Sequence, residues 1–257
     1  MGKVLSFRCL DDPRCVLTRS FGMTNIEAVA NAPPLALAAP RDREGGIFGV
    51  AGVAVGLASL ALAPPWPASD ASESVIRQYF AEHGAGFLWQ CIVLSAGFVI
   101  LARFYAGLAL SVARAGAEAL GWTALAGVAT TTVAIIVGNA PWAVIAYRAP
   151  SEAGLLLLLW DLGLIAAFTV ASPCIAAMWL ALGLGILRTG TLPATYGYAL
   201  LAAATVHLGA GACVARSGIF SPNGAVGLGC ILVHVVCTLV GAVLLLRAPA
   251  TVRRGSV

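Results

Sequence analysis

The sequence predicts an all-α fold, a polytopic membrane bundle of six transmembrane helices with both ends of the chain in the cytoplasm. Hydrophobic residues make up 60% of the 257 residues, charged residues make up only 10%, and the mean hydropathy is +0.93. A soluble domain carries about 25% charged residues, so this composition excludes one, and it excludes a nucleic-acid-binding protein as well. The apolar residues form long runs without the two-residue alternation of a barrel strand, which favours helices.

Six segments are apolar enough to cross a bilayer core, which takes roughly 20 residues. We expect the cytoplasmic segment 1–46 to be largely irregular, the transmembrane domain to cover 47–247, and a cytoplasmic tail to cover 248–257. The fourth span is long and contains Pro173, where a kink is expected; a split there into two spans is the alternative. The predicted spans are 47–63, 87–112, 121–147, 153–187, 192–214 and 225–246.

Basic residues give the predicted orientation, because Lys and Arg are enriched in cytoplasmic segments. With the N-terminus inside, eleven of the 15 basic residues lie on the cytoplasmic side and only Arg77, Arg148 and Arg216 lie outside. The chain has one Lys and fourteen Arg and is rich in Ala and Gly, as is typical of GC-rich bacterial genomes. The predicted location is therefore the bacterial cytoplasmic (inner) membrane.

The external segment 72–83 has the pattern of an amphipathic helix. Its apolar residues Val75, Ile76, Tyr79 and Phe80 recur at helical spacing and lead straight into the second span. We expect this helix to cover the outer end of the bundle; a lid over a ligand is the alternative.

Strongly polar side chains inside spans are costly and are therefore functional candidates. At about 1.5 Å per residue, Asn139, His207 and His234 lie roughly 10–14 Å from the outer ends of their spans. Asp161 belongs to the same layer when its depth is counted from the start of the fourth span. These four residues are predicted to line a polar pocket on the outer side; interhelical hydrogen bonding alone is the structural alternative.

We expect the protein to hold no cofactor. Three metal or haem sites are the alternatives. Cys230, His234 and Cys237 share one helix face and form, with His207, a candidate ligand set for zinc or copper. His207, His234 and Asp161 form a second set, suited to iron, and haem held by the two histidines is the third.

Two arginines are predicted to anchor the protein to lipid. Arg103 lies in the inner half of the second span with no carboxylate at its depth, so it is expected to extend toward the inner interface. Arg188 is expected at the cytoplasmic end of the fourth span, in a turn where Gly190 ends that helix and Pro193 begins the next. Gly52 and Gly56 form a GxxxG face for helix packing within the chain, with a dimer interface as the alternative. Besides the lipid bilayer, the expected partners are another protein or a second copy of the chain.

Two short stretches resemble a family of small bacterial membrane proteins known as a domain of unknown function. The stretches are Trp160-Asp161-Leu162-Gly163 and Arg188-Thr189-Gly190-Thr191-Leu192-Pro193. The resemblance implies six helices and implies no activity.

The sequence carries no Walker loop, Rossmann glycine pattern, HExxH or GxSxG motif, so it does not favour an enzyme. We expect an accessory or interaction role with a polar pocket on the outer side. The alternatives are a small transporter or proton-coupled carrier, and a metal- or haem-binding redox protein.

Overall fold

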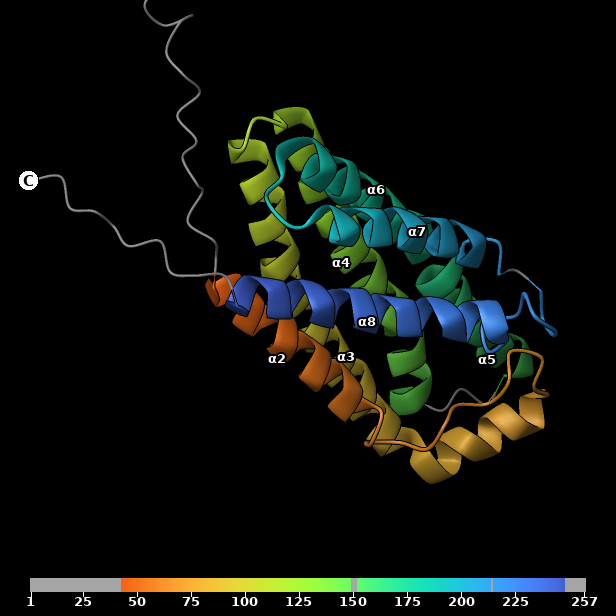
Figure 1. The fold of residues 1–257 in the computed structure, drawn as a ribbon. Helices are drawn as coiled ribbons and strands as arrows, with labels where there is room; N and C mark the ends of the chain where they lie inside the picture. Colours follow the sequence, from red (N-terminus) through yellow and green to blue (C-terminus); the bar gives the residue numbers. More distant parts are fainter. Residues whose placement is uncertain (1–42, 149–151, 214, 248–257) are drawn as a thin grey trace, which may run out of the picture. The chain divides into compact units, whose positions relative to one another are not determined.

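A computed structural model of the chain describes residues 43–148, 152–213 and 215–247. Every regular secondary-structure element in the described part is a helix, which confirms the all-α prediction (Figure 1). The predicted tail 248–257 and nearly all of the predicted segment 1–46 lie outside the described residues. The helices are α2 (Arg43–Ser59), α3 (Glu73–Arg114), α4 (Glu118–Arg148), α5 (Ala153–Leu164), η1 (Ile165–Val170), α6 (Ala171–Thr189), α7 (Ala194–Ala210) and α8 (Ala225–Arg247).

The helices form a closed ring in which each one packs mainly against two neighbours. The order around the ring is α2, α3, α4, the continuous run α5–η1–α6, α7 and α8, and α8 packs back against α2. At this closing contact the backbone of Gly46 lies against Ala242 and Leu246. Side chains from all the helices around the ring meet in its interior.

Within the described residues, four helices are long and apolar enough to cross a membrane, whereas the sequence predicts six spans. The four are Glu73–Arg114, Glu118–Arg148, Gly154–Thr189 and Ala225–Arg247. The remaining two, α2 and α7, are helical near the predicted positions but have only 17 residues each. Both helices end earlier than the predicted spans, because the loops that follow them take up the last apolar residues.

The predicted external helix and second span are one helix. α3 has 42 residues, roughly 63 Å at 1.5 Å per residue and about twice the thickness of a hydrocarbon core. In Figure 1 its first turns run across the end of the bundle, and the rest of the helix runs along it. Ile76 and Phe80 are buried on the bundle side of these first turns, and the Phe80 ring lies 6.1 Å from that of Trp160.

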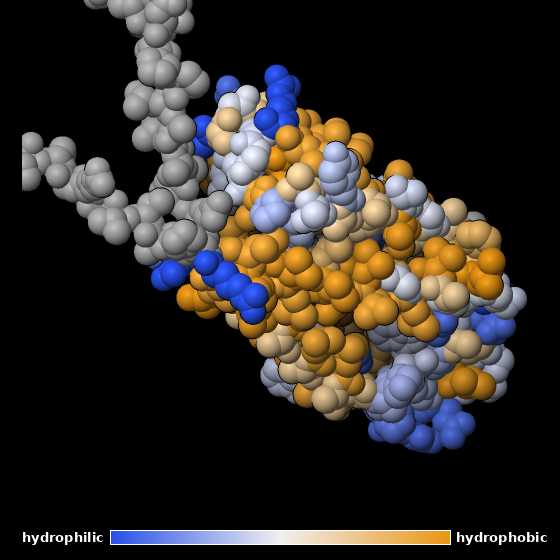
Figure 2. Space-filling model, in the orientation of Figure 1, coloured by the Kyte–Doolittle hydropathy of each residue, from blue (hydrophilic) through white to orange (hydrophobic). Residues whose placement is uncertain are grey.

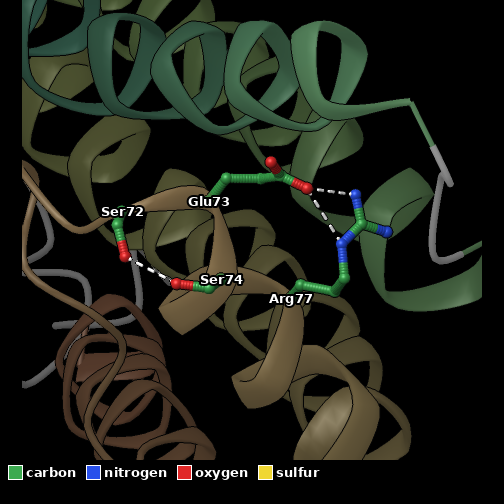
Figure 3. A network of polar contacts seen from close by, with 4 residues as sticks. All are labelled: Ser72, Glu73, Ser74 and Arg77. Carbon is green, nitrogen blue, oxygen red and sulfur yellow. Dashed lines mark hydrogen bonds and ion pairs between the residues drawn. The ribbon is translucent and has the colours of Figure 1, made fainter.

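Short polar contacts organise the start of α3 (Figure 3). Arg77 donates from two nitrogens to the Glu73 carboxylate one turn earlier, and the Ser72 and Ser74 hydroxyls are 2.9 Å apart. Such i, i+4 pairs stabilise an exposed helix by a few tenths of a kcal/mol. They favour helical structure here, at the point where the chain leaves the loop.

The long fourth apolar segment stays continuous, and a π-helix precedes Pro173, the residue where a kink is expected. Residues Ile165–Val170 form π-helical turns directly before α6. Pro173 has no N–H to donate to the carbonyl four residues earlier, and a wider turn is one way in which a helix accommodates such a missing bond. The segment is thus a single run, and the split into two spans is not seen.

The Arg188–Pro193 stretch forms the turn that its sequence predicts. Gly190 has the left-handed backbone angles φ 65° and ψ 20°, and its N–H donates to the Ile186 carbonyl at 2.8 Å. A left-handed glycine is a common helix ending. Pro193 precedes the first turn of α7, where its fixed φ suits a helix start.

The outer sides of the helices are apolar. In the most apolar 18-residue windows of the four long helices, only 28–39% of the residues are buried, so most of these apolar residues face outward. Figure 2 shows an apolar band over the visible face with hydrophilic residues gathered toward its ends. This distribution is the one expected of helices surrounded by lipid.

The GxxxG glycines pack against α3, as the sequence predicts. A Cβ on Gly97 of α3 would lie 3.2 Å from the Gly56 nitrogen and 3.3 Å from the Gly52 carbonyl oxygen. The two backbones therefore touch at this crossing, which only small residues allow.

Gly52→Ala and Gly56→Ala are a matched pair that tests this packing. An added Cβ at Gly52 would lie 2.6 Å from the Leu101 side chain, whereas one at Gly56 meets nothing within 4 Å. We expect Gly52→Ala to lower the free energy of unfolding by about 1–3 kcal/mol, the usual cost of overpacking. Gly56→Ala should have little effect. Thermal unfolding in detergent, followed by circular dichroism, measures both, and equal effects would contradict the packing described.

Candidate functional site

Four helices bring polar and aromatic side chains together inside the ring. This group, called the histidine cluster below, consists of Tyr105 (α3), Trp179 (α6), His207 (α7), and His234 and Thr238 (α8). Each of these side chains is 8% exposed or less. The His234 ring stacks on the Trp179 indole at a centroid distance of 5.0 Å and an angle of 19°. His207 meets the same indole edge-on at 4.8 Å, and the two imidazole centroids are 5.8 Å apart.

The hydrogen bonds in the histidine cluster have a definite direction. Thr238 has one hydroxyl proton and donates it to the His234 carbonyl at 2.7 Å. The 2.6 Å bond between Tyr105 and Thr238 is therefore donated by Tyr105. The Tyr105 oxygen then presents a lone pair to His234 Nε2, 3.5 Å away, which favours a proton on Nε2. The unshared pair of the His234 ring is consequently on Nδ1.

Most ring nitrogens of the two histidines have no hydrogen-bond partner. Both nitrogens of His207 and Nδ1 of His234 are buried and unpaired, as is Nε1 of Trp179. More than 90% of buried polar groups in proteins are paired, and an unpaired one costs about 1–3 kcal/mol. The histidines therefore do not join the helices by side-chain hydrogen bonds to one another. Their lone pairs can accept a proton or coordinate a cation.

A small cavity adjoins His234 between α3, α4 and α6. Its volume is about 10 Å³, and its lining includes Tyr105, Thr131, Met178 and His234. The Thr131 hydroxyl is also buried without a partner. A cavity of this size is at the lower limit for one water molecule. The space beside His234 thus suits a single atom or a single small molecule.

Asn139 lies apart from the histidine cluster. It is buried on α4 and donates from its side-chain nitrogen to the Ser95 hydroxyl of α3 at 3.0 Å. Within the described residues, no hydrogen bond, ion pair or ring contact joins it to His207 or His234. Asn139 links two neighbouring helices, which is the structural alternative considered for the polar residues.

Asp161 also lies apart, at the end of the ring where α7 ends. Its carboxylate accepts a hydrogen bond from Arg216 at 3.3 Å, and the two side chains are 36% and 80% exposed. Both line an open cavity of about 180 Å³ together with Ser69 and Cys213.

The predicted pocket of four residues is therefore divided among three places. Only His207 and His234 meet, whereas Asn139 faces α3 and Asp161 faces the loop after α7. Spacing along the sequence indicates how deep each residue lies in its span, but it does not indicate in which direction the side chain points around the helix axis. Residues at one depth consequently point to different neighbours.

The metal-ligand sets with more than two members are not assembled. In the residues that the structure describes, no three His, Cys, Asp or Glu side chains are placed to hold one metal ion. The Cys230 thiol donates to the Gly227 carbonyl at 3.0 Å, and the Cys237 side chain is only partly buried at the edge of the core. Trp179 packs against both imidazoles, in space that a porphyrin between them requires.

The two predicted anchor residues lie at the opposite end from Asp161. Arg103 is 4.0 Å from the Glu44 carboxylate and lies over the Phe48 ring at 5.6 Å. The expectation that no carboxylate lies at its depth is wrong, because α2 begins at Arg43 and brings Glu44 alongside. Arg188 is exposed in the last turn of α6 and lines an open cavity of about 460 Å³ with Glu118.

Three members of the histidine cluster were not among the predicted residues. Thr238 follows His234 by four residues and so shares its helix face, which is the one signal that the sequence offers. Tyr105 and Trp179 are aromatic residues in apolar spans, where their polar atoms do not distinguish them from core residues.

Comparisons with protein-family models, with curated proteins and with solved structures find no match to this chain. The resemblance to the six-helix family of unknown function therefore stays a prediction.

Proposed function

We propose that the protein is a multi-pass protein of the bacterial cytoplasmic membrane with an accessory or interaction role. In this proposal six helices span the membrane, both ends of the chain are cytoplasmic, and the functional element is the histidine cluster in the outer half. One observation carries the proposal: two buried imidazoles lie 5.8 Å apart with three of their four nitrogens unpaired. Proteins retain such costly arrangements mainly at functional sites.

The arrangement of helix ends supports six spans. α2 and α7 have 17 residues each, the lower end of the range that crosses a bilayer. Apolar residues beyond α2, Leu60 and Leu62, are exposed and extend its apolar length. Four arginines mark the same end of the ring, where basic residues of a cytoplasmic face belong: Arg43 starts α2, and Arg114, Arg188 and Arg247 end α3, α6 and α8.

Cysteine labelling on the two sides of α7 tests whether this helix crosses. In a background without the natural cysteines, Thr191→Cys lies in the turn before α7 and Ser217→Cys in the loop after it. We expect a membrane-impermeant maleimide to label Ser217→Cys in intact cells and to leave Thr191→Cys unlabelled until the cells are opened. Equal labelling of both positions in intact cells would show that α7 does not cross.

The proposed role of the histidines predicts a gain in stability when they are removed. His207→Leu replaces an unpaired polar ring with an apolar side chain of similar size. We expect the free energy of unfolding to rise by about 1 kcal/mol, because a buried unpaired polar group is removed. Thermal unfolding in detergent measures the change, with His83→Leu at a partly exposed position as the control. A loss of 2 kcal/mol or more would instead assign His207 a packing role.

A proton-coupled carrier is the second candidate, favoured by the position of the histidine cluster between two open cavities. The cavity at Asp161 and the cavity at Arg188 lie at opposite ends of the ring. In liposomes with an imposed pH gradient, a carrier would speed the decay of the gradient, and the double variant His207→Leu, His234→Leu would abolish the effect. A decay equal to that of empty liposomes excludes proton movement by this protein alone.

A further inference from the structure

We propose that His207 and His234 bind one soft monovalent cation, of the Cu(I) or Ag(I) class, between their rings. The inference rests on the role proposed above for the histidine cluster and specifies its ligand. It is carried by the separation of the rings, by the absence of charge around them and by their unpaired nitrogens.

The ring separation fits a single bridging ion. An imidazole nitrogen lies about 2 Å from a metal ion that it coordinates, so two such nitrogens are at most about 4 Å apart. Because each ring adds roughly 1 Å from nitrogen to centroid, the centroids are then about 6 Å apart. The observed value is 5.8 Å, with the ring planes at 78°. A direct hydrogen bond does not form, since neither His207 nitrogen has a partner.

The protonation pattern leaves a coordinating lone pair on each ring. Tyr105 favours the proton on His234 Nε2, so the unpaired Nδ1 has the free electron pair. His207 is unpaired at both nitrogens, so either one can coordinate while the other keeps its proton. Binding therefore requires no proton release from neutral histidines.

The surroundings select the charge and the softness of the ion. Besides His207, the aromatic rings next to the His234 ring are those of Phe98, Tyr105 and Trp179, and none of them carries a charge. Asp161 is engaged with Arg216 elsewhere. A buried dication without a carboxylate would be strongly disfavoured, and zinc prefers four ligands. A monovalent d¹⁰ ion accepts few ligands, and imidazole suits copper.

Trp179 completes the site as an aromatic wall. Its indole lies 5.0 Å from the His234 ring and 4.8 Å from the His207 ring, so one side chain holds both imidazoles. An aromatic face also attracts a cation placed near it, most strongly where water is excluded. The wall is fully buried, because Trp179 has 0% exposure.

Nitrogen NMR of the imidazoles tests the site directly, because the chain contains only three histidines. The full-length protein, labelled with ¹⁵N in its imidazoles and purified in detergent, is titrated with Ag(I), a redox-inactive probe. We expect one nitrogen of His207 and one of His234 to shift together and to saturate together. His83, which is partly exposed on α3, serves as the internal control. The imidazole signals do not report silver bound to the seven cysteines, whereas a measurement of total bound silver would include it.

The outcomes separate this proposal from the one on which it rests. His207→Leu should raise the Ag(I) concentration needed to shift the His234 signal by at least about 100-fold, the upper end of the effect of removing an outer-shell partner. His83→Ala should leave that concentration unchanged. Unmoved His207 and His234 signals, in protein that melts as a folded species, overturn the cation site. A Zn(II) response at lower concentration than Ag(I) or Cu(I) overturns the soft-ion class. Neither result alters the stability gain expected of His207→Leu, so the proposed role of the cluster is tested separately.

Discussion

The contact between α8 and α2 closes the ring of helices, and the enclosed interior depends on it. The two helices approach closely because Gly46 and Gly49 of α2 face Ala242 of α8 without side chains between them. This approach holds α8 in place between α2 and α7, so that His234 and Thr238 point inward. If α2 and α8 were farther apart, lipid or water would reach the histidine cluster, and water would pair its free nitrogens.

The enclosed histidines differ from ordinary polar residues of a membrane bundle. Asn139 reaches a hydroxyl on the next helix, and Tyr105 and Thr238 satisfy each other and a backbone carbonyl. The imidazoles instead depend on aromatic contacts, which fix ring positions but pair no nitrogen. Three of the four imidazole nitrogens are thus buried without a partner in one cluster, which is the reason for assigning them a ligand.

The sequence predicted most of the helices but only part of the site. Long apolar runs located the helices, and the Arg188–Pro193 turn and the packing of Gly52 and Gly56 were also predicted. The early start of α2 was missed because Gly45 and Gly46 are poor helix formers, and with it the Arg103 partner Glu44. Depth estimates placed His207 and His234 in one layer. They could not give the rotation of each helix, so Asp161 and Asn139 were misplaced, and Trp179 was indistinguishable from a core residue.

The π-helix before α6 determines which way Trp179 points. Trp160 and Trp179 are 19 positions apart, which in a regular α-helix is five full turns plus about 100°. A π-helical segment takes up one extra residue, or about 100° of rotation, and so brings the two tryptophans onto one face of the run. Both are buried, at 1% and 0% exposure. The extra residue thus acts as a one-position phase correction: without it, either the aromatic layer around Trp160 or the indole beside the two histidines would face outward.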